Sequence, residues 1–349
     1  MLEALHKLKE KVLRPVCAVC ANEDCGYKGK RAPVKPFLFS EQSQNEPTEF
    51  EIFFRTDIAE YRYNLHIKKE NVVYESLDRV KFETGRQSAL FERKENVIEL
   101  KGVFSRSQIS AEISEKLPLL SYLMITHDRN EVVSDVLTWF EHGIDFMNYS
   151  NPFQEMRLAI AQTDEAKQLI LKMIQEMYLD IDDFRVEEKE DDIEVYMRHN
   201  VEGDVQELTL REESSGTQKV FGVLPFIVRS IMSGTTLVID ELDAKVHPLL
   251  LKYIIELYTN PASNCTGAQL LFTSHDLSTM NSEVFRRDEI WFVAKGKQQN
   301  SKLYSLVEFK NKNGESVRKD ARFDKQYLEG KYGADPYLKK IIDWSDVNA

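Results

Sequence analysis

The stretch Thr235–Pro248, TTLVIDELDAKVHP, constrains the fold of this chain more than any other part of the sequence. Its apolar residues Leu237–Ile239 follow Gly234 closely and run directly into two adjacent carboxylates, Asp240 and Glu241. A short apolar run bounded in this way is typical of a buried parallel strand, and open α/β sheets bind ligands beyond the carboxyl ends of such strands. The first carboxylate suits the water shell of Mg²⁺, and the second suits the activation of an attacking water. Taken alone, the pair is also explained by a solvated acidic turn.

Two other motifs follow the pattern expected for the same kind of site. Residues Ser214–Gln218, within the string ESSGTQ, lead into an amphipathic run, which predicts a helix that begins at a Ser-Gly loop. Backbone N–H groups at such a helix start, together with the helix dipole, suit a phosphate. Downstream, the apolar run Leu270–Ser274 predicts a second strand, which leads into His275. A histidine there can reach the same site as Glu241, although a structural role is the common alternative.

In this order the three motifs resemble those of the ABC-type ATPases, in particular their compact SMC-like and OLD-like branch. The chain looks most similar to the AAA-type ATP-binding proteins of the RloA kind, which are encoded beside Toprim nucleases in bacterial defence loci. On this resemblance ESSGTQ matches the signature loop, LVIDELD the Walker B strand and TSHD the switch histidine. The resemblance implies an α/β fold. Its P-loop NTPase core would hold a doubly wound, mainly parallel sheet, with an antiparallel β subdomain and a helical lobe beside it.

The resemblance also implies ATP and Mg²⁺ as cofactors and gives each motif a role. Asp240 would hold the Mg²⁺ shell, Glu241 would act as the catalytic base, and His275 would contact the γ-phosphate. Family members work as head-to-tail homodimers, in which the signature loop of one subunit closes over the γ-phosphate bound to the other. The residues expected to contact nucleotide in this way are Ser214, Ser215, Gly216, Thr217 and Gln218. Asp243 and the turn His247–Pro248 are candidates for the dimer interface.

One part of the family's site has no counterpart in the sequence. No G-x-x-x-x-G-K-[ST] string occurs. The closest string, Gly26–Arg31, has the wrong spacing, lacks a Ser or Thr after its lysine and follows no apolar strand. Residues Met1–Lys9 resemble the helix that directly follows the phosphate loop in this family. We therefore expect the first strand and the phosphate loop upstream of Met1, and an inactive chain without them. A late start, a split gene, a trimmed sequence and a true loss of the loop all fit.

Composition limits the class of protein. The 349 residues include 42% apolar and 30% charged side chains, which is typical of one large globular domain or two intimate ones. No apolar run approaches the roughly 20 residues of a membrane span, and no signal peptide pattern is present. We therefore expect a cytoplasmic protein without a membrane partner. The net charge of −12 argues against a nucleic-acid surface over the whole chain, but leaves a local groove for DNA or RNA at the dimer open.

The four cysteines do not form a disulfide framework in a chain of this size and agree with a reducing compartment. Cys17 and Cys20 have the CxxC spacing of metal ligands, and Cys25 lies close by. A structural zinc site needs four ligands, however, and Cys265 is distant in the sequence. We expect ordinary thiols in a loop, with a zinc site as the alternative.

Patterns along the chain predict four regions. Residues 1–104 are expected to hold the N-terminal part of the ATPase core, with a first helix and an antiparallel meander of strands from about Phe50 to Leu100. Residues 105–185 are expected to form the helical lobe, residues 186–310 the C-terminal core with all three motifs, and residues 311–349 a tail. The helices expected in the lobe, from apolar residues at three- and four-residue intervals, are Ser110–Met124, Glu131–Phe146 and Asp164–Met177.

The C-terminal core has its own expected elements. Residues 186–192 should form a solvated acidic turn, and Ile193–Leu210 a hairpin. After the Walker B motif we expect helices at Leu249–Tyr258 and Ser278–Phe285, and a further strand at Glu289–Ala294. This order suits a parallel core with right-handed crossovers.

These features favour an ATPase head that dimerises around Mg·ATP and gates a Toprim-type nuclease partner in anti-phage defence. The alternative is an ATP-independent scaffold derived from such an ATPase. A nuclease in its own right is disfavoured, because the chain ends soon after the ATPase core and leaves no space for a fused Toprim domain.

Overall fold

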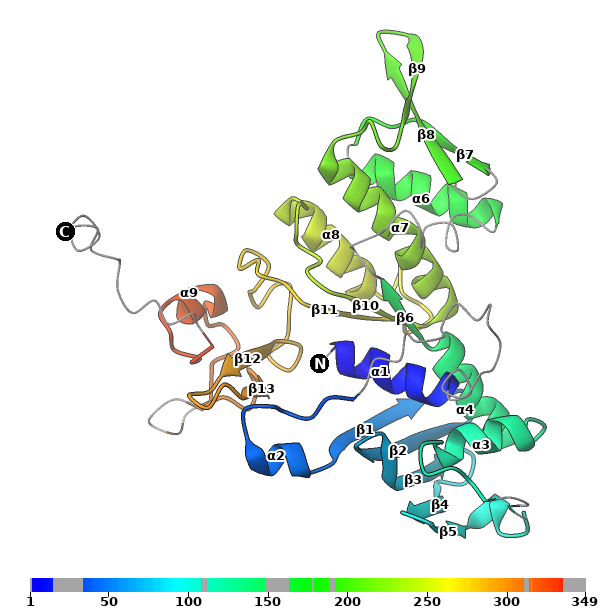
Figure 1. The fold of residues 1–349 in the computed structure, drawn as a ribbon. Coiled ribbons are helices and arrows are strands. Elements are labelled where there is room, and N and C mark those ends of the chain that lie inside the picture. The colour runs from blue at the N-terminus through cyan, green and yellow to red at the C-terminus, as the bar shows by residue number, and fades with distance from the viewer. Residues whose placement is uncertain are drawn as a thin grey trace, which may run out of the picture. The chain divides into compact units, whose positions relative to one another are not determined.

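The computed structural model describes residues 2–14, 34–107, 109, 112–147, 163–177, 179–188, 193–310, 314 and 316–334. The chain divides into two compact units (Figure 1). The first comprises Met1–Asp240 with Pro261–Thr273, and the second comprises Glu241–Asn260 with Ser274–Ala349. The predictions for Cys17, Cys20, Cys25 and Gly26–Arg31 concern residues outside the described ranges.

The first unit contains a five-stranded antiparallel sheet whose spatial order follows the chain. Its strands are β1 Thr48–Arg55, β2 Ala59–Lys68, β3 Asn71–Lys81, β4 Arg86–Lys94 and β5 Val97–Leu100. Successive side chains of a strand point to opposite faces, so Tyr61, Tyr63 and Leu65 of β2 all point into the core and are fully buried. The predicted antiparallel meander is confirmed.

Three helices of the same unit lie beside this sheet (Figure 1), and their apolar side chains share its core. They are α1 Leu2–Leu13, α3 Leu119–Thr126 and α4 Glu131–His142; the short helices α2 Glu41–Asn45 and η2 Gly102–Phe104 lie before and after the meander in the chain. The buried carboxylate of Glu75 on β3 connects sheet and helices, because it accepts hydrogen bonds from the amides of Leu119 and Leu120 at 2.6 and 2.9 Å. It therefore caps the start of α3.

Two predicted helices are shorter than expected. Residues 112–118 are not helical, and α3 begins only after Pro118, which has extended backbone angles. A proline disfavours helical angles in the residue before it, so a helix cannot run easily through Leu117 into Pro118. The predicted helix Glu131–Phe146 ends at His142, and Ile144–Met147 form strand β6 instead.

Strand β6 belongs to a three-stranded parallel sheet of order β11-β10-β6, in which β10 is Thr236–Ile239 and β11 is Gln269–Phe272. Val238 on the central strand pairs with Phe146 of β6 and with Leu271 of β11. Leu237–Ile239 are buried, as a central parallel strand requires. The expectation that residues 105–185 are helical is therefore wrong for β6, because tertiary pairing with β10 outweighs the local pattern.

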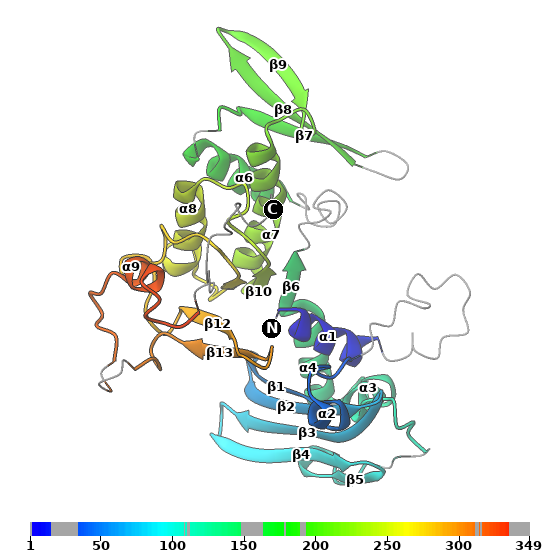
Figure 2. The ribbon, with the colours of Figure 1, turned by 60° about the vertical axis from the view of Figure 1, so that its left-hand side comes forward.

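The remaining part of the first unit pairs two helices with a small sheet. It consists of α6 Asp164–Glu176, β7 Asp183–Glu188, β8 Ile193–Val201, β9 Asp204–Thr209 and α7 Ser215–Ser233. The predicted β8–β9 hairpin is confirmed and extends beyond α6 and α7 (Figure 2). Residues 186–188, predicted as a turn, belong to β7. Although α7 has 19 residues, no helix in the described ranges is long and apolar enough to cross a membrane.

The second unit contains α8 Pro248–Thr259, β12 Trp291–Lys295, β13 Ser301–Ser305 and α9 Phe323–Leu328. Its core includes Ile290, Phe292, Leu306, Phe323 and Tyr332. Two predictions are wrong here. Residues 278–285 form turns, because the short side chains of Asp276 and Asn281 bind nearby backbone amides and compete with a helix. Strand β12 pairs antiparallel with β13, rather than extending a parallel core.

Candidate functional site

The parallel sheet places a carboxylate and a hydroxyl at one of its edges. Ile239 and Phe272, the last residues of β10 and β11, are paired, so the residues that follow them, Asp240 and Thr273, emerge together. The amide of Thr273 donates to the carbonyl of Ile239 at 3.1 Å and extends the ladder by one residue. The Thr273 hydroxyl donates to the carboxylate of Asp240. Asp240 is thereby fixed at the carboxyl edge of the sheet while it remains exposed to solvent.

An exposed carboxylate in this position fits the water shell of a magnesium ion, since Mg²⁺ takes oxygen ligands and keeps several of its waters. Among the described residues, no three His, Cys, Asp or Glu side chains gather in a way that could hold a metal ion. An ion at Asp240 would therefore take its other ligands from water and from the oxygens of a bound phosphate.

Glu241, the first residue of the second unit, has an unusual backbone conformation. Its φ of 50° lies in the left-handed region, which costs a residue with a β-carbon of order 1–3 kcal/mol. The carbonyl of Glu241 accepts the amide of Ala244 at 3.1 Å and so closes a tight turn. The side chain of Glu241 is exposed.

Asp243 and His275 contact each other within the second unit. One carboxylate oxygen of Asp243 accepts the backbone amide of His275 at 3.2 Å. The other oxygen is buried and has no hydrogen-bond partner in the described part of the chain. The imidazole of His275 is exposed and forms no hydrogen bond with any residue of the described ranges. Both ring nitrogens can therefore contact a ligand. Asp243, expected at a dimer interface, thus contacts His275 of its own chain.

The turn His247–Pro248, the other interface candidate, starts α8. The exposed His247 is the N-cap, and its Nδ1 accepts the amide of Leu249 at 3.2 Å. Proline fits the first helical turn because its missing N–H would have had no acceptor there.

The segment after His275 is fixed by Asp276. Its carboxylate accepts the Thr279 amide at 2.9 Å, the Thr279 hydroxyl at 2.8 Å and the Ser278 hydroxyl at 2.8 Å. Burial alone would raise the pKa of Asp276, but these hydrogen bonds to the charged form outweigh burial and hold the pKa below its ordinary value. Asp276 therefore orders the chain directly beyond His275.

The signature loop, Glu213–Gln218, forms the start of α7. Ser214 is the N-cap, and its hydroxyl accepts the amide of Thr217 at 3.1 Å. The carbonyl of Ser214 accepts the amide of Gln218 at 2.9 Å. The amides of Ser215 and Gly216 have no acceptor within the described ranges. They are the donors that a helix start offers to an anion.

Neighbouring side chains hold this loop in place. Gln218 donates from its side-chain amide to the carbonyls of Arg211 and Glu213, at 3.1 and 2.7 Å. The carboxylate of Glu212 accepts the amide and the hydroxyl of Thr209, both at 2.8 Å, and these bonds lower the pKa of Glu212. These four contacts fix the segment that precedes α7.

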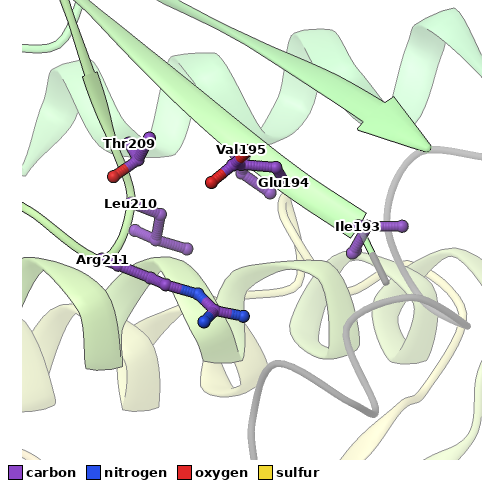
Figure 3. A pocket seen from close by; sticks show the side chains of 6 residues that line it. All are labelled: Ile193, Glu194, Val195, Thr209, Leu210 and Arg211. Atoms are coloured by element: carbon purple, nitrogen blue, oxygen red, sulfur yellow. The ribbon is translucent and has the colours of Figure 1, made fainter. Parts of the chain in front are cut away.

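A shallow hollow lies beside this segment (Figure 3). It is lined by Ile193, Glu194, Val195, Thr209, Leu210 and Arg211. Its empty volume is about 210 Å³, which is below the roughly 300 Å³ at which small-molecule pockets begin. The hollow is therefore a surface feature of the lobe and is too small for a nucleotide.

The sequence alone assigned no role to two residues that the structure connects to the predicted site. Thr273 stands in the TSHD motif, and its position directly after a strand parallel to β10 was the available signal. Asp276 ends the same motif, and a short acidic side chain before Ser278 and Thr279 was the signal for a turn.

The chain was compared with family models, with curated proteins and with solved structures. A model of the family described as "AAA domain, putative AbiEii toxin, Type IV TA system" matches residues 27–281. Among curated proteins, none matches the sequence.

Solved structures of SMC heads are also similar. The SMC head domain from Thermotoga maritima has 12% identity and a TM-score of 0.34, over 71% of this chain and 74% of that one. The SMC head bound to the C-winged helix domain of ScpA has 13% identity and a TM-score of 0.39, over 87% and 86%. A structure described under ATP-driven dimerization and DNA stimulated activation of SMC ATPases has 14% identity and a TM-score of 0.32, over 43% and 86%. These identities and TM-scores are too low to support a family assignment. The assignment rests on the sequence model, which covers more than half of the chain. The chain belongs to the AAA domain family described by that model.

Proposed function

We propose that this chain is the ATP-binding and ATP-hydrolysing head of an ABC/SMC-like ATPase. The observation that carries the proposal is the parallel sheet edge, where the carboxylate of Asp240 follows the central strand and accepts a hydrogen bond from Thr273 of the neighbouring strand. Ligands of α/β sheets bind at this edge, and a fixed carboxylate there suits a phosphate-bound magnesium ion.

Each residue would contribute a defined step. Asp240 would hold the water shell of Mg²⁺, which when bound neutralises charge on the phosphates. Glu241, on its strained turn, would accept the proton of the attacking water. His275 would donate a hydrogen bond to a γ-phosphate oxygen. Since phosphoryl transfer depends on positioning and charge stabilisation, fixed backbone turns at these residues suit the reaction.

The signature loop would act on the nucleotide bound to a second copy of the chain. The amides of Ser215 and Gly216 would donate to the γ-phosphate, and Ser214, Thr217 and Gln218 would hold the loop in the closed dimer. This part of the proposal is supported by the likeness of ESSGTQ to the signature loop and by the unbonded amides at the start of α7. The gating of a Toprim-type nuclease, the role in anti-phage defence and the binding of DNA or RNA at the dimer rest on the family resemblance alone.

The phosphate loop would come from residues that precede Met1 in a longer form of the protein, because none of the 349 residues forms the G-x-x-x-x-G-K-[ST] motif. The first check is the genomic reading frame upstream of Met1. An in-frame motif there favours the ATPase. A stop codon without a complementing fragment favours the alternative, an ATP-independent scaffold.

The decisive experiment uses Glu241→Gln in the longer form. We expect the variant to bind Mg·ATP and to dimerise as the wild type does, but to hydrolyse ATP at least about 100-fold more slowly, because the amide cannot accept the proton. Calorimetry, light scattering and phosphate release measure the three quantities. Glu283→Gln, at an exposed position of the same unit, is the control and should hydrolyse normally.

The 349-residue chain itself should bind ATP at least about 100-fold more weakly than the longer form, because it lacks the backbone cradle and lysine of the phosphate loop. Normal hydrolysis by Glu241→Gln would show that the assigned base is wrong. Identical dimerisation of the longer form with and without ATP would favour the scaffold.

A further inference from the structure

His199 on β8 joins the hairpin to the signature loop through its two ring nitrogens. Its Nε2 lies 2.6 Å from the carboxylate of Glu213, the residue that precedes the N-cap of α7. Its Nδ1 lies 2.8 Å from the backbone carbonyl of Asp180. The side chains of His199 and Glu213 are only 18% and 10% exposed, so water competes little for either contact.

Both partners of the imidazole are hydrogen-bond acceptors. A backbone carbonyl can only accept, and an ionised carboxylate can only accept. Nδ1 therefore donates to the Asp180 carbonyl, and Nε2 lies within hydrogen-bond distance of the Glu213 carboxylate. These two contacts, one on each ring nitrogen, fix the orientation of the ring.

The position of Glu213 controls the start of α7. Its carbonyl accepts the side-chain amide of Gln218 at 2.7 Å, so the residue is tied to the first helical turn as well as to His199. The next residue, Ser214, is the N-cap that shapes the turn from which the amides of Ser215 and Gly216 emerge. Displacement of Glu213 would therefore change where these two donors point.

We propose that His199 is a positioning residue of the nucleotide site. It holds Glu213, and thereby sets the direction in which the amides of the signature loop meet a γ-phosphate bound to a second copy of the chain. The role toward phosphate rests on the function proposed above, whereas the coupling between His199 and the loop belongs to this chain alone. The two can fail separately, and the test has one arm for each.

The first arm measures amide hydrogen exchange in the 349-residue chain. We expect His199→Ala to accelerate exchange of the hydrogen-bonded amides of Thr217 and Gln218 about tenfold, which corresponds to a loss of about 1.4 kcal/mol of local stability. Exchange of the β8–β9 pairs should stay unchanged. Glu213→Ala should have the same effect, and the double variant no more than either single one. Glu213→Gln keeps a hydrogen-bonding group opposite Nε2 and should recover most of the protection. His142→Ala, at a histidine whose side chain is 77% exposed, is the control.

The second arm measures ATP hydrolysis by the longer form. His199→Ala should lower kcat about tenfold and leave the monomer's affinity for ATP unchanged, because the loop meets the phosphate only in the closed dimer. Glu213→Gln should recover most of kcat. A lower kcat with an unchanged affinity for ATP distinguishes a positioning role from a general loss of structure.

Four outcomes decide the proposal. Faster amide exchange confined to the start of α7, together with a lower kcat, supports it. Unchanged exchange of the Thr217 and Gln218 amides overturns the coupling, even if ATP is hydrolysed. Faster exchange throughout the hairpin and α7 overturns it too, since His199 would then be merely structural. If the wild-type longer form hydrolyses no ATP, the proposed function fails and the role toward phosphate falls with it. Tenfold faster amide exchange at the start of α7 in His199→Ala would still establish the coupling in that case.

Discussion

Asp243 has one carboxylate oxygen bonded to the His275 amide and one that is buried and has no hydrogen-bond partner among the described residues. An unpaired buried oxygen costs more on a charged group than on a neutral amide. Asn can still accept the His275 amide through its remaining oxygen. Asp243→Asn should therefore leave the free energy of unfolding unchanged or raise it by up to about 1 kcal/mol.

Asp243→Ala should instead lower the free energy of unfolding by about 1 kcal/mol and accelerate exchange of the His275 amide, because the acceptor is lost. Denaturant unfolding and hydrogen exchange measure the two effects. Asp320→Asn, at an exposed position of the same unit, should change neither. A loss of stability in Asp243→Asn equal to that in Asp243→Ala would mean that the charge itself is needed.

At the scale of elements, Glu75 connects β3 to the start of α3. Its carboxylate accepts the amides of Leu119 and Leu120 and the hydroxyl of Tyr63 at 2.9 Å. Each buried group left unpaired costs about 1–3 kcal/mol, so Glu75→Ala should lower the free energy of unfolding by about 3 kcal/mol or more. Chemical denaturation measures this. Asp57→Asn, at an exposed turn of the same sheet, is expected to have no effect.

Glu75 also predicts a pH dependence. Burial raises the pKa of Glu75, so the folded chain holds this proton to a higher pH than the unfolded chain. Its contribution to stability is complete below the unfolded value, about 4.3, and falls as the pH rises through the folded pKa. Glu75→Gln cannot ionise, so its free energy of unfolding should not fall in this way. Raising the pH from 4 should therefore destabilise the wild type relative to the variant. Parallel stability profiles of the two proteins would contradict this assignment.

Elements with strong local signals could be predicted from the sequence. The meander strands, α6, α7 and the β8–β9 hairpin follow from alternation, helical spacing and turn residues. The sequence patterns gave the wrong secondary structure where a single residue interrupted a helix or where a strand formed by pairing with a distant segment. Pro118 delayed α3, and Asp276 and Asn281 replaced the helix expected at Ser278–Phe285 with turns. Strand β6 is four residues long and forms only by pairing with β10.

The same contrast applies to the candidate site. The sequence motifs predicted Asp240, Glu241 and His275, because strand ends and acidic pairs are local features. The supporting contacts could not be predicted, because they join residues that are far apart in the chain. Thr273 reaches Asp240 only through the pairing of β10 with β11, and His199 reaches Glu213 only through the closure of the hairpin.

At the scale of the whole molecule, the two sheets differ in how far apart their paired residues lie. The meander joins consecutive strands, whereas Thr236 pairs with Ile144, about ninety residues earlier. Closing a long loop costs entropy before the contact forms, so the parallel sheet should fold later. In pulse-labelled refolding, amides of β2 and β3 should be protected before those of β10. The local β8–β9 hairpin should be protected with the early group. Simultaneous protection of all three would contradict this order.

The origin of β6 has a consequence for anyone who builds chimaeras between relatives of this protein. Residues 105–185 could be chosen as a single segment to exchange between two homologues. Ile144–Met147 lie inside it and complete the side of β10 that faces away from β11. A graft that omits these four residues would leave an open apolar edge at the strand that ends at Asp240, and a donor cassette must bring an equivalent strand of its own.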